Sequence, residues 1–203
     1  AKRRSQALPA EAYLFEQTVH WLKEMNLAHG LSIRALGNSA RHELMVETDG
    51  QASNLKDVGV GVSQVLPVIV AALFAQPGHI VIVEEPESHL HPLAQSKLAE
   101  LLAQVSKERN VQFIVETHSE HLFRRMQTLI AREEVSVADA AMYFVERDGK
   151  NTNLLPLEVD DLGRVKNWPK HFFGDTLGET REQTALAIKR AKELRAKDGD
   201  VPN

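Results

Sequence analysis

Apolar residues recur along this chain in three patterns, and each pattern predicts a different kind of element. Apolar positions three or four residues apart predict amphipathic helices, strict alternation predicts half-buried strands, and short continuous apolar runs predict strands of a parallel sheet. The helical spacing predicts helices at 9–27, 62–75, 92–109, 120–132 and 178–197. Alternation predicts a small β-hairpin or meander within 31–57, and continuous runs predict strands at 79–83, 111–115 and 141–146.

The predicted elements after residue 79 follow the order strand, helix, strand, helix, strand. This order predicts an α/β fold with a mainly parallel sheet flanked by helices and joined by right-handed crossovers. We expect one α/β domain over 1–150 and a small helical C-terminal appendage over 151–203.

Composition excludes several functions. Hydrophobic residues make up 43% of the chain and charged residues 26%, as in an ordinary globular protein. The net charge of -4 provides no overall basic field for nucleic acid, although a local patch could still bind DNA. The sequence contains no cysteine, which excludes disulfides, thiolate zinc sites and cysteine nucleophiles. The longest strongly apolar stretch, 65–75, is too short to span a bilayer, so we expect a cytoplasmic protein with no membrane segment.

Two adjacent carboxylates, Glu84 and Glu85, directly follow the strand predicted at 79–83. Open α/β sheets bind ligands at the carboxyl ends of their strands. Alternation turns the two side chains to opposite sides, so they suit different tasks. One could hold Mg²⁺, which prefers oxygen ligands, and the other could polarise a water for attack on a phosphate. The alternative is a strand that simply emerges into solvent with acidic residues.

The next predicted strand, 111–115, also leads into polar residues, among them His118. Parallel strands end at the same edge of a sheet, so His118 is expected to approach the glutamates. An imidazole there can hydrogen-bond a terminal phosphate and link nucleotide state to structure. The alternative is that Thr117 or Ser119 caps the following helix while the histidine is merely exposed.

A loop with two glycines, Gly59 and Gly61, leads into the helix predicted at 62–75. Glycine lets the backbone approach a ligand closely, and a helix N-terminus favours an anion. An ordinary turn before a core helix is the alternative.

Ser88, His89 and His91 come shortly after the paired glutamates. The two histidines raise the alternative of a transition-metal site. Because no cysteine supports such a site, we favour phosphate chemistry for this segment.

These motifs, in this order, resemble the ABC-type ATPase lineage that includes the SMC, RecF and OLD proteins, over roughly residues 59–173. The segment 59–64 resembles the signature loop of that lineage, 80–85 its Walker B strand and 88–92 its D-loop, and His118 resembles the switch histidine. The run Glu-Glu-Pro-Glu followed by His-Leu-His-Pro is particularly similar to AAA-family ATPases related to OLD. The resemblance implies the C-terminal lobe of a P-loop NTPase of the ABC head type.

The resemblance also implies a role for each matching residue. Glu84 would bind Mg²⁺, Glu85 would be the catalytic base and His118 would sense the γ-phosphate. A second copy, in a head-to-tail homodimer, would hold the nucleotide that this chain contacts in trans. The residues implied in that contact are Gly59, Gly61, Ser63 and Gln64. The sequence departs from the usual pattern in three places, with Glu84 where aspartate is common and with Val60 and Val62 where serine and glycine are common.

The sequence contains no glycine-rich loop followed by Lys-Ser or Lys-Thr, the Walker A loop that cradles the β- and γ-phosphates. We therefore expect the C-terminal part of an ATP-hydrolysing switch, which uses ATP and Mg²⁺ only together with that loop. The isolated chain is expected to be inactive and to bind ATP weakly or not at all. The resemblance suggests DNA maintenance or phage defence, with DNA or an effector protein as candidate partner.

Two other function classes stay open. A non-catalytic regulatory or scaffold domain would keep the fold and dock a partner effector. A nuclease is less favoured, because only about 85 residues follow His118 and small domains begin at about 50 residues. Those residues also lack a Glu plus Asp-x-Asp set. The aromatic cluster formed by Trp168-Pro169 and Phe172-Phe173 is expected to pack on the ATPase lobe, with a partner-docking patch as the alternative.

Overall fold

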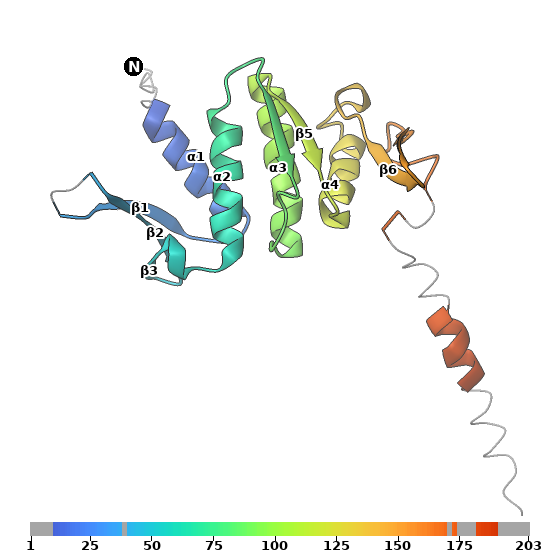
Figure 1. The fold of residues 1–203 in the computed structure, drawn as a ribbon, viewed down its shortest axis with the longest axis horizontal. Helices are drawn as coiled ribbons and strands as arrows, with labels where there is room; N and C mark the ends of the chain where they lie inside the picture. The colour runs from blue at the N-terminus through green and yellow to red at the C-terminus, as the bar shows by residue number, and fades with distance from the viewer. Residues whose placement is uncertain (1–9, 38–39, 170–171, 174–181, 191–203) are drawn as a thin grey trace, which may run out of the picture. The chain divides into compact units, whose positions relative to one another are not determined.

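The computed structural model describes residues 10–37, 40–169, 172–173 and 182–190 (Figure 1). The chain forms two compact units. The first comprises Ala1–Ala141 and Val159–Arg164, and the second comprises Met142–Glu158 and Val165–Asn203.

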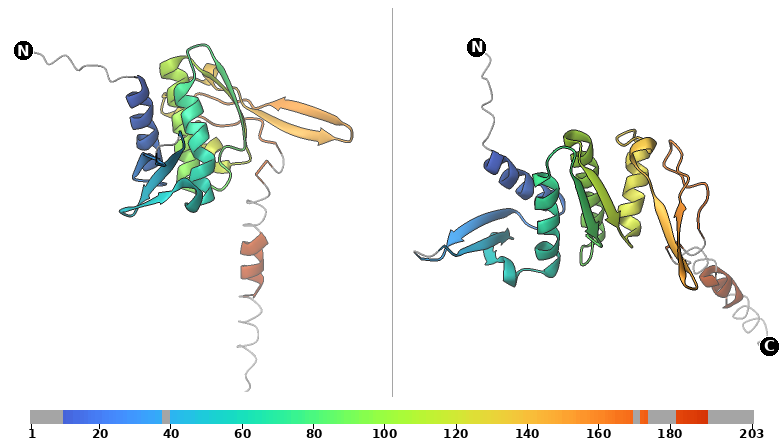
Figure 2. Two further views of the ribbon diagram at one scale, coloured as in Figure 1. Left: turned by 60° about the vertical axis from the view of Figure 1, so that its left-hand side comes forward. Right: turned by 45° about the horizontal axis from the view of Figure 1, so that its top comes forward.

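The first unit contains most of the regular structure. Its elements, in chain order, are α1 (Ala10–Glu24), β1 (Gly30–Ala35), β2 (His42–Thr48), β3 (Gln51–Asn54), the short 3-10 helix η1 (Leu55–Asp57), α2 (Val60–Phe74), β4 (Ile80–Glu84), α3 (Pro92–Arg109), β5 (Gln112–Glu116), α4 (Glu120–Ala131) and the 3-10 helix η2 (Val137–Asp139). Strands β1, β2 and β3 form an antiparallel meander, as the alternating pattern predicted. Helices α2, α3 and α4 stand side by side, and β4 and β5 run along α3 (Figures 1 and 2).

The core of this unit lies between the helices and one face of β4 and β5. Helix α2 is apolar on most sides and packs one face into the core, whereas Val60 and Phe74, at its two ends, are 50% and 67% exposed. The side chains of Ile69, Leu98 and Leu101 are fully buried, and Trp21 of α1 is 4% exposed. Val81, Phe113 and Val115, on the inner face of β4 and β5, pack against this cluster.

The outer face of β4 and β5 is exposed, which corrects the expectation of strands buried on both sides. The strands are parallel and in register, with Ile82 opposite Ile114 and Glu84 opposite Glu116. Ile80, Ile82 and Ile114 are 58%, 67% and 50% exposed. Their continuous apolar sequence suits strands covered on both faces, but the described helices cover only one.

The strand expected at 141–146 does not extend the parallel sheet. In the second unit β6 (Tyr143–Asp148) pairs antiparallel with β7 (Asn151–Pro156), a strand that the sequence analysis missed. Asp148 pairs with Asn151, so the turn consists of Gly149 and Lys150, and Gly149 has φ +59°, as a tight hairpin turn requires. The pairing of β6 is thus fixed by a local turn rather than by a crossover.

Aromatic rings pack together in the second unit. The ring of Phe172 lies 5.2 Å from Phe144 of β6 and 5.2 Å from Trp168, and 4.3 Å from Phe173. Residues 182–190 are helical, and the rest of the helix expected at 178–197 falls outside the described residues. In the part of the chain that the structure describes, no helix is both long enough and apolar enough to cross a membrane.

Candidate functional site at the ends of strands β4 and β5

The polypeptide turns sharply where β4 ends, and this turn aims the second of the paired glutamates. The amide of Glu85 still pairs with the carbonyl oxygen of Glu116, at 2.9 Å, one step beyond the strand. Glu85 itself has φ +42°, a left-handed conformation that costs a non-glycine residue about 1–3 kcal/mol. Its carbonyl then accepts from the amide of Ser88 at 3.0 Å. Such strain at a strand end is typical of functional sites.

Glu85 and His118 lie close together, as the parallel arrangement predicted. The Nε2 atom of His118 is 3.8 Å from Oε1 of Glu85 and 3.3 Å from Oε1 of Glu116. The hydroxyl of Ser88 donates to Oε2 of Glu85 at 3.1 Å. The side chains of Glu85, Glu116 and His118 are all exposed. The site therefore presents two carboxylates and an imidazole to solvent at one sheet edge.

Glu84 lies on the outer face of β4, in register with Glu116. Ligand atoms of Glu85, Glu116 and His118 lie within 4.8 Å of one another, a grouping that includes Glu116 but not Glu84. The exposed carboxylates suit Mg²⁺, which prefers oxygen donors and keeps several waters, whereas imidazole is a donor for softer metals. The chemistry of this donor set fits Mg²⁺ held by carboxylates, with Glu116 as a candidate that the sequence analysis missed.

Glu87 is also missing from the residues predicted for the site. It is only 6% exposed, and its Oε1 atom accepts from the amide of His118 at 3.0 Å and from the hydroxyl of Thr117. Among the described residues, none provides a hydrogen bond to its Oε2 atom. A pattern of strand ends cannot find this residue, because Glu87 lies in the turn after β4.

The residues of the segment that resembles a D-loop, 88–92, have separate environments. Nδ1 of His91 accepts from the amide of Ala94 at 3.3 Å, so His91 is the N-cap of α3 and Pro92 follows at the first helical position. His89 is exposed and has φ +62°. Ser88 instead contacts Glu85, as described above.

The two glycines of the signature-like loop differ in what surrounds them. Gly59 is the N-cap of α2, and a Cβ added there would meet nothing within 4 Å. A Cβ added to Gly61 would lie 2.8 Å from the carbonyl oxygen of His89. The hydroxyl of Ser63 donates to the carbonyl of Val60 at 2.9 Å, and Gln64 is exposed. Gly61 therefore packs against the backbone of His89 and the side chain of Leu90, whereas Gly59 is open.

Ion pairs that stabilise the helices lie away from the strand ends. Nζ of Lys97 is 3.0 Å from Oε2 of Glu24 on α1 and 2.9 Å from Oε2 of Glu100. The hydrogen bonds that Lys97 donates to Glu100 and to Glu24 raise the pKa of Lys97, and the bond to Lys97 lowers the pKa of Glu24. In the loop after β7, hydrogen bonds from Arg164 lower the pKa of Asp160.

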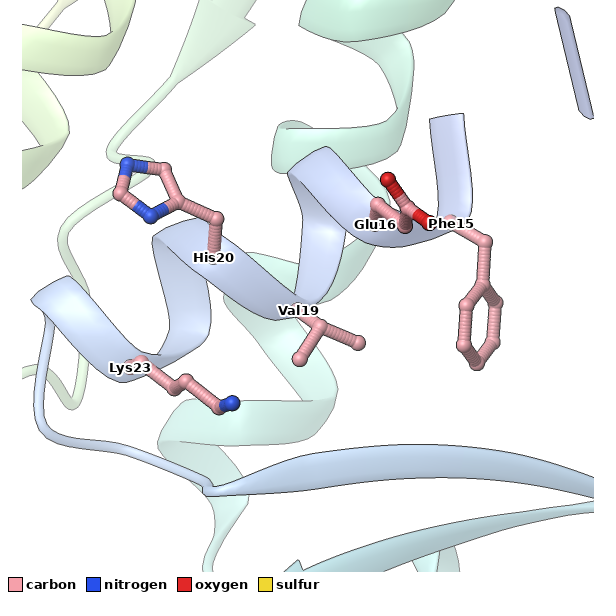
Figure 3. A pocket seen from close by; sticks show the side chains of 5 residues that line it. All are labelled: Phe15, Glu16, Val19, His20 and Lys23. Atoms are coloured by element: carbon pink, nitrogen blue, oxygen red, sulfur yellow. The ribbon is translucent and has the colours of Figure 1, made fainter. Parts of the chain in front are cut away.

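A shallow hollow beside α1 is separate from the strand ends. It is lined by side chains on successive turns of one helix, Phe15, Glu16, Val19, His20 and Lys23 (Figure 3). A ligand site usually combines an enclosed apolar surface with convergent polar groups from several elements. This hollow is built by one helix, and we assign no ligand to it.

Two protein families match parts of the sequence. The model of a family described as "AAA domain, putative AbiEii toxin, Type IV TA system" matches residues 14–124. The model of a family of proteins of unknown function, DUF3696, matches residues 135–183. A search of curated proteins found no match.

Several solved structures share the fold. One is described as "Structural biochemistry of ATP-driven dimerization and DNA stimulated activation of SMC ATPases", with 15% identity and a TM-score of 0.53 over 74% of this chain and 90% of that one. An Smc head with coiled coil and joint from Pyrococcus yayanosii has 13% identity and a TM-score of 0.51 over 73% of this chain. An Smc head from Pyrococcus furiosus bound to the C-terminal domain of ScpA has 13% identity and a TM-score of 0.51 over 91% of this chain. This chain spans only 27% and 38% of the two Pyrococcus proteins.

Proposed function

Because this chain belongs to the AAA domain family whose model covers residues 14–124 and has the P-loop NTPase-like fold of SMC ATPase heads, we propose that it is the C-terminal part of an ATP-hydrolysing ABC-type switch. The observation that carries the proposal is the approach of His118 to Glu85, with Nε2 and Oε1 3.8 Å apart. These two side chains come from consecutive parallel strands and meet at the edge where α/β sheets bind ligands.

In this proposal each side chain at the sheet edge has a distinct task. Glu85 accepts a proton from the attacking water, while the Ser88 hydroxyl holds its other oxygen at 3.1 Å. His118 hydrogen-bonds the γ-phosphate and so distinguishes the states before and after cleavage. Glu84, with Glu116 beside it, would hold Mg²⁺, which neutralises charge on the phosphates when it is bound.

The exposed outer face of β4 and β5 supports a further part of the proposal, that this chain works with a complementary half. Ile80, Ile82 and Ile114 expose half or more of their surface there. Parallel strands are stable when both faces are covered. We propose that the part of the head with the Walker A loop covers this face and places ATP at the strand ends.

The open backbone at Gly59 supports a contact with a second copy. A helix N-terminus attracts phosphate, and nothing lies within 4 Å of the Cβ position of Gly59. We propose a head-to-tail homodimer in which Gly59, Ser63 and Gln64 contact nucleotide held by the partner. ATP should then increase the molar mass measured by light scattering for a head with Glu85→Gln. An unchanged mass at saturating ATP would argue against this dimer.

Calorimetry tests the dependence on a complementary half. ATP with Mg²⁺ should give no micromolar binding to the isolated chain and should bind once a polypeptide with the Walker A loop is supplied. Micromolar affinity of the isolated chain would contradict the proposal.

A regulatory or scaffold domain is the alternative function, and phosphate release separates the two. With the Walker A loop supplied, the switch releases phosphate and loses that activity with Glu85→Gln. A scaffold releases none, or an amount that this substitution leaves unchanged. We place the switch in DNA maintenance or phage defence, and duplex DNA should then stimulate phosphate release.

A further inference from the structure

Glu87 is the one buried acidic residue among those that the structure describes, and the proposed hydrolysis gives it no role. Acidic side chains are seldom buried unless they are paired. The Oε1 atom of Glu87 accepts two hydrogen bonds from the loop after β5, one from the amide of His118 at 3.0 Å and one from the Thr117 hydroxyl. The carboxylate thus contacts the residue that precedes His118 and the backbone of His118 itself.

The hydrogen bonds of Glu87 form one bridge between the turn after β4 and the loop after β5, and Gln95 forms a second bridge between them. Gln95, in the first turn of α3, donates from Nε2 to the carbonyl of Leu90 at 2.8 Å. Its Oε1 atom accepts from the hydroxyl of Ser119. That hydroxyl also accepts from the amide of Leu122 at 2.9 Å and so caps α4. The D-loop, the loop that carries His118 and the start of α4 are therefore joined through side chains.

The two bridges restrict the backbone around His118. Glu87 holds the His118 amide, and Gln95 holds the next residue, Ser119. The His118 imidazole itself is exposed. Because the His118 ring is exposed, the distance from its Nε2 atom to Glu85 depends on the position of the His118 backbone.

We propose that Glu87 is a positioning residue that, together with Gln95, fixes the loop 117–119 against the turn 87–90 and so sets the approach of His118 to Glu85. The role in catalysis rests on the proposed ATPase function, whereas the positioning itself does not. Glutamine at position 87 could still accept through its amide oxygen, but alanine could not.

Amide hydrogen exchange of His118, measured by NMR on the full chain, tests the positioning directly. With Glu87→Ala, exchange of the His118 amide should accelerate roughly tenfold to a hundredfold relative to Leu101, because a bond to a charged acceptor is lost. With Glu87→Gln the protection should largely persist. Glu108→Ala, which removes an exposed carboxylate on α3, serves as control and should leave His118 unchanged.

A His118 exchange rate that Glu87→Ala does not change would overturn the proposal. If that variant does not fold, Thr117→Val provides a second test, because it removes one of the two bonds to Glu87, together with the bond that the Thr117 hydroxyl accepts from the amide of Ser119. It should accelerate His118 exchange severalfold, and an unchanged rate would equally overturn the proposal.

The catalytic consequence is measured in a head that contains the Walker A loop. Glu87→Ala should lower kcat for phosphate release while KM for ATP stays within about twofold, and Glu87→Gln should restore most of kcat. If kcat is unchanged by Glu87→Ala, the catalytic part of the proposal is wrong. If the unsubstituted head releases no phosphate while His118 exchange responds as expected, the ATPase function fails and the positioning stands.

Discussion

Substituting Gly61 with alanine introduces a steric conflict between the signature-like loop and the D-loop-like turn at His89 and Leu90. The new Cβ would lie 2.8 Å from the carbonyl oxygen of His89 and 3.4 Å from Cδ2 of Leu90. The carbonyl is backbone, and Leu90 is only 6% exposed, so neither neighbour can turn away easily. The start of α2 or the D-loop must therefore move.

The expected magnitude follows from two opposing effects. Overpacking costs about 1–3 kcal/mol, and replacing a helical glycine with alanine recovers roughly 0.5–1 kcal/mol. The free energy of unfolding should therefore fall by roughly 0–2.5 kcal/mol, and by about 1 kcal/mol at the middle of the two ranges. Gly59→Ala is the matched control, because nothing lies within 4 Å of its Cβ position. Its stability should change by no more than about 0.5 kcal/mol.

Urea unfolding followed by the fluorescence of Trp21 measures this difference. Trp21 is buried in the first unit, and Trp168→Phe removes the other tryptophan, so the signal reports on the first unit alone. Gly61→Ala should lower the urea midpoint below that of Gly59→Ala. Equal midpoints, or a higher midpoint for Gly61→Ala, would refute the close contact between α2 and the D-loop.

Three further substitutions test packing and electrostatics by the same urea assay. Gly163→Ala should lower the free energy of unfolding by about 2–5 kcal/mol, because Gly163 has φ +71° and its Cβ would lie 2.1 Å from the carbonyl oxygen of Gln127. A loss below about 1 kcal/mol would contradict this contact. Leu98→Ala should cost about 2–5 kcal/mol, since Leu98 is fully buried in the core, and a smaller loss would mean that the cavity collapses. Lys97→Met should destabilise the chain at neutral pH. The bond to Lys97 lowers the pKa of Glu24, so it stabilises the fold only while Glu24 is ionised. The difference in unfolding free energy between the variant and the unsubstituted chain should therefore shrink as the pH falls below 4.5, the ordinary pKa of Glu24. An equal difference at pH 7 and at pH 3 would exclude this pair as its source.

Periodicity predicted the helices and the meander of the first unit because each of these elements buries one face, whereas β4 and β5 were predicted from their continuous apolar runs. Helices α1 to α4 and the meander agree with the predicted ranges to within a few residues, and the comparisons confirm the α/β fold and the ATPase relationship. Strand β7 was missed because its sequence is polar at Asn151 and Asn153 and lacks the apolar alternation of a half-buried strand. Its pairing follows from the turn at Gly149 instead.

The candidate site was predicted where it depends on strand ends, and missed where it depends on loops. The approach of His118 to Glu85 follows from parallel strands that end at one edge. Glu116 could have been found by counting to the end of the second strand. Glu87 and Gln95 could not have been found in this way. The hydrogen bond of Glu87 to His118 joins residues 31 apart in the sequence, and that of Gln95 to Ser119 joins residues 24 apart, and no local spacing encodes such contacts.

Phosphate release by the head that contains the Walker A loop, measured over a range of Mg²⁺ concentrations, tests the division of labour between the paired glutamates. Glu85→Gln should lower the rate by about 10²- to 10⁴-fold at every Mg²⁺ concentration, as expected for loss of a general base. Glu84→Gln should instead raise the Mg²⁺ concentration needed for half-maximal rate. Glu108→Gln, an exposed control on α3, should change neither quantity. Full activity of Glu85→Gln at saturating Mg²⁺ would contradict the assignment of Glu85 as the catalytic base.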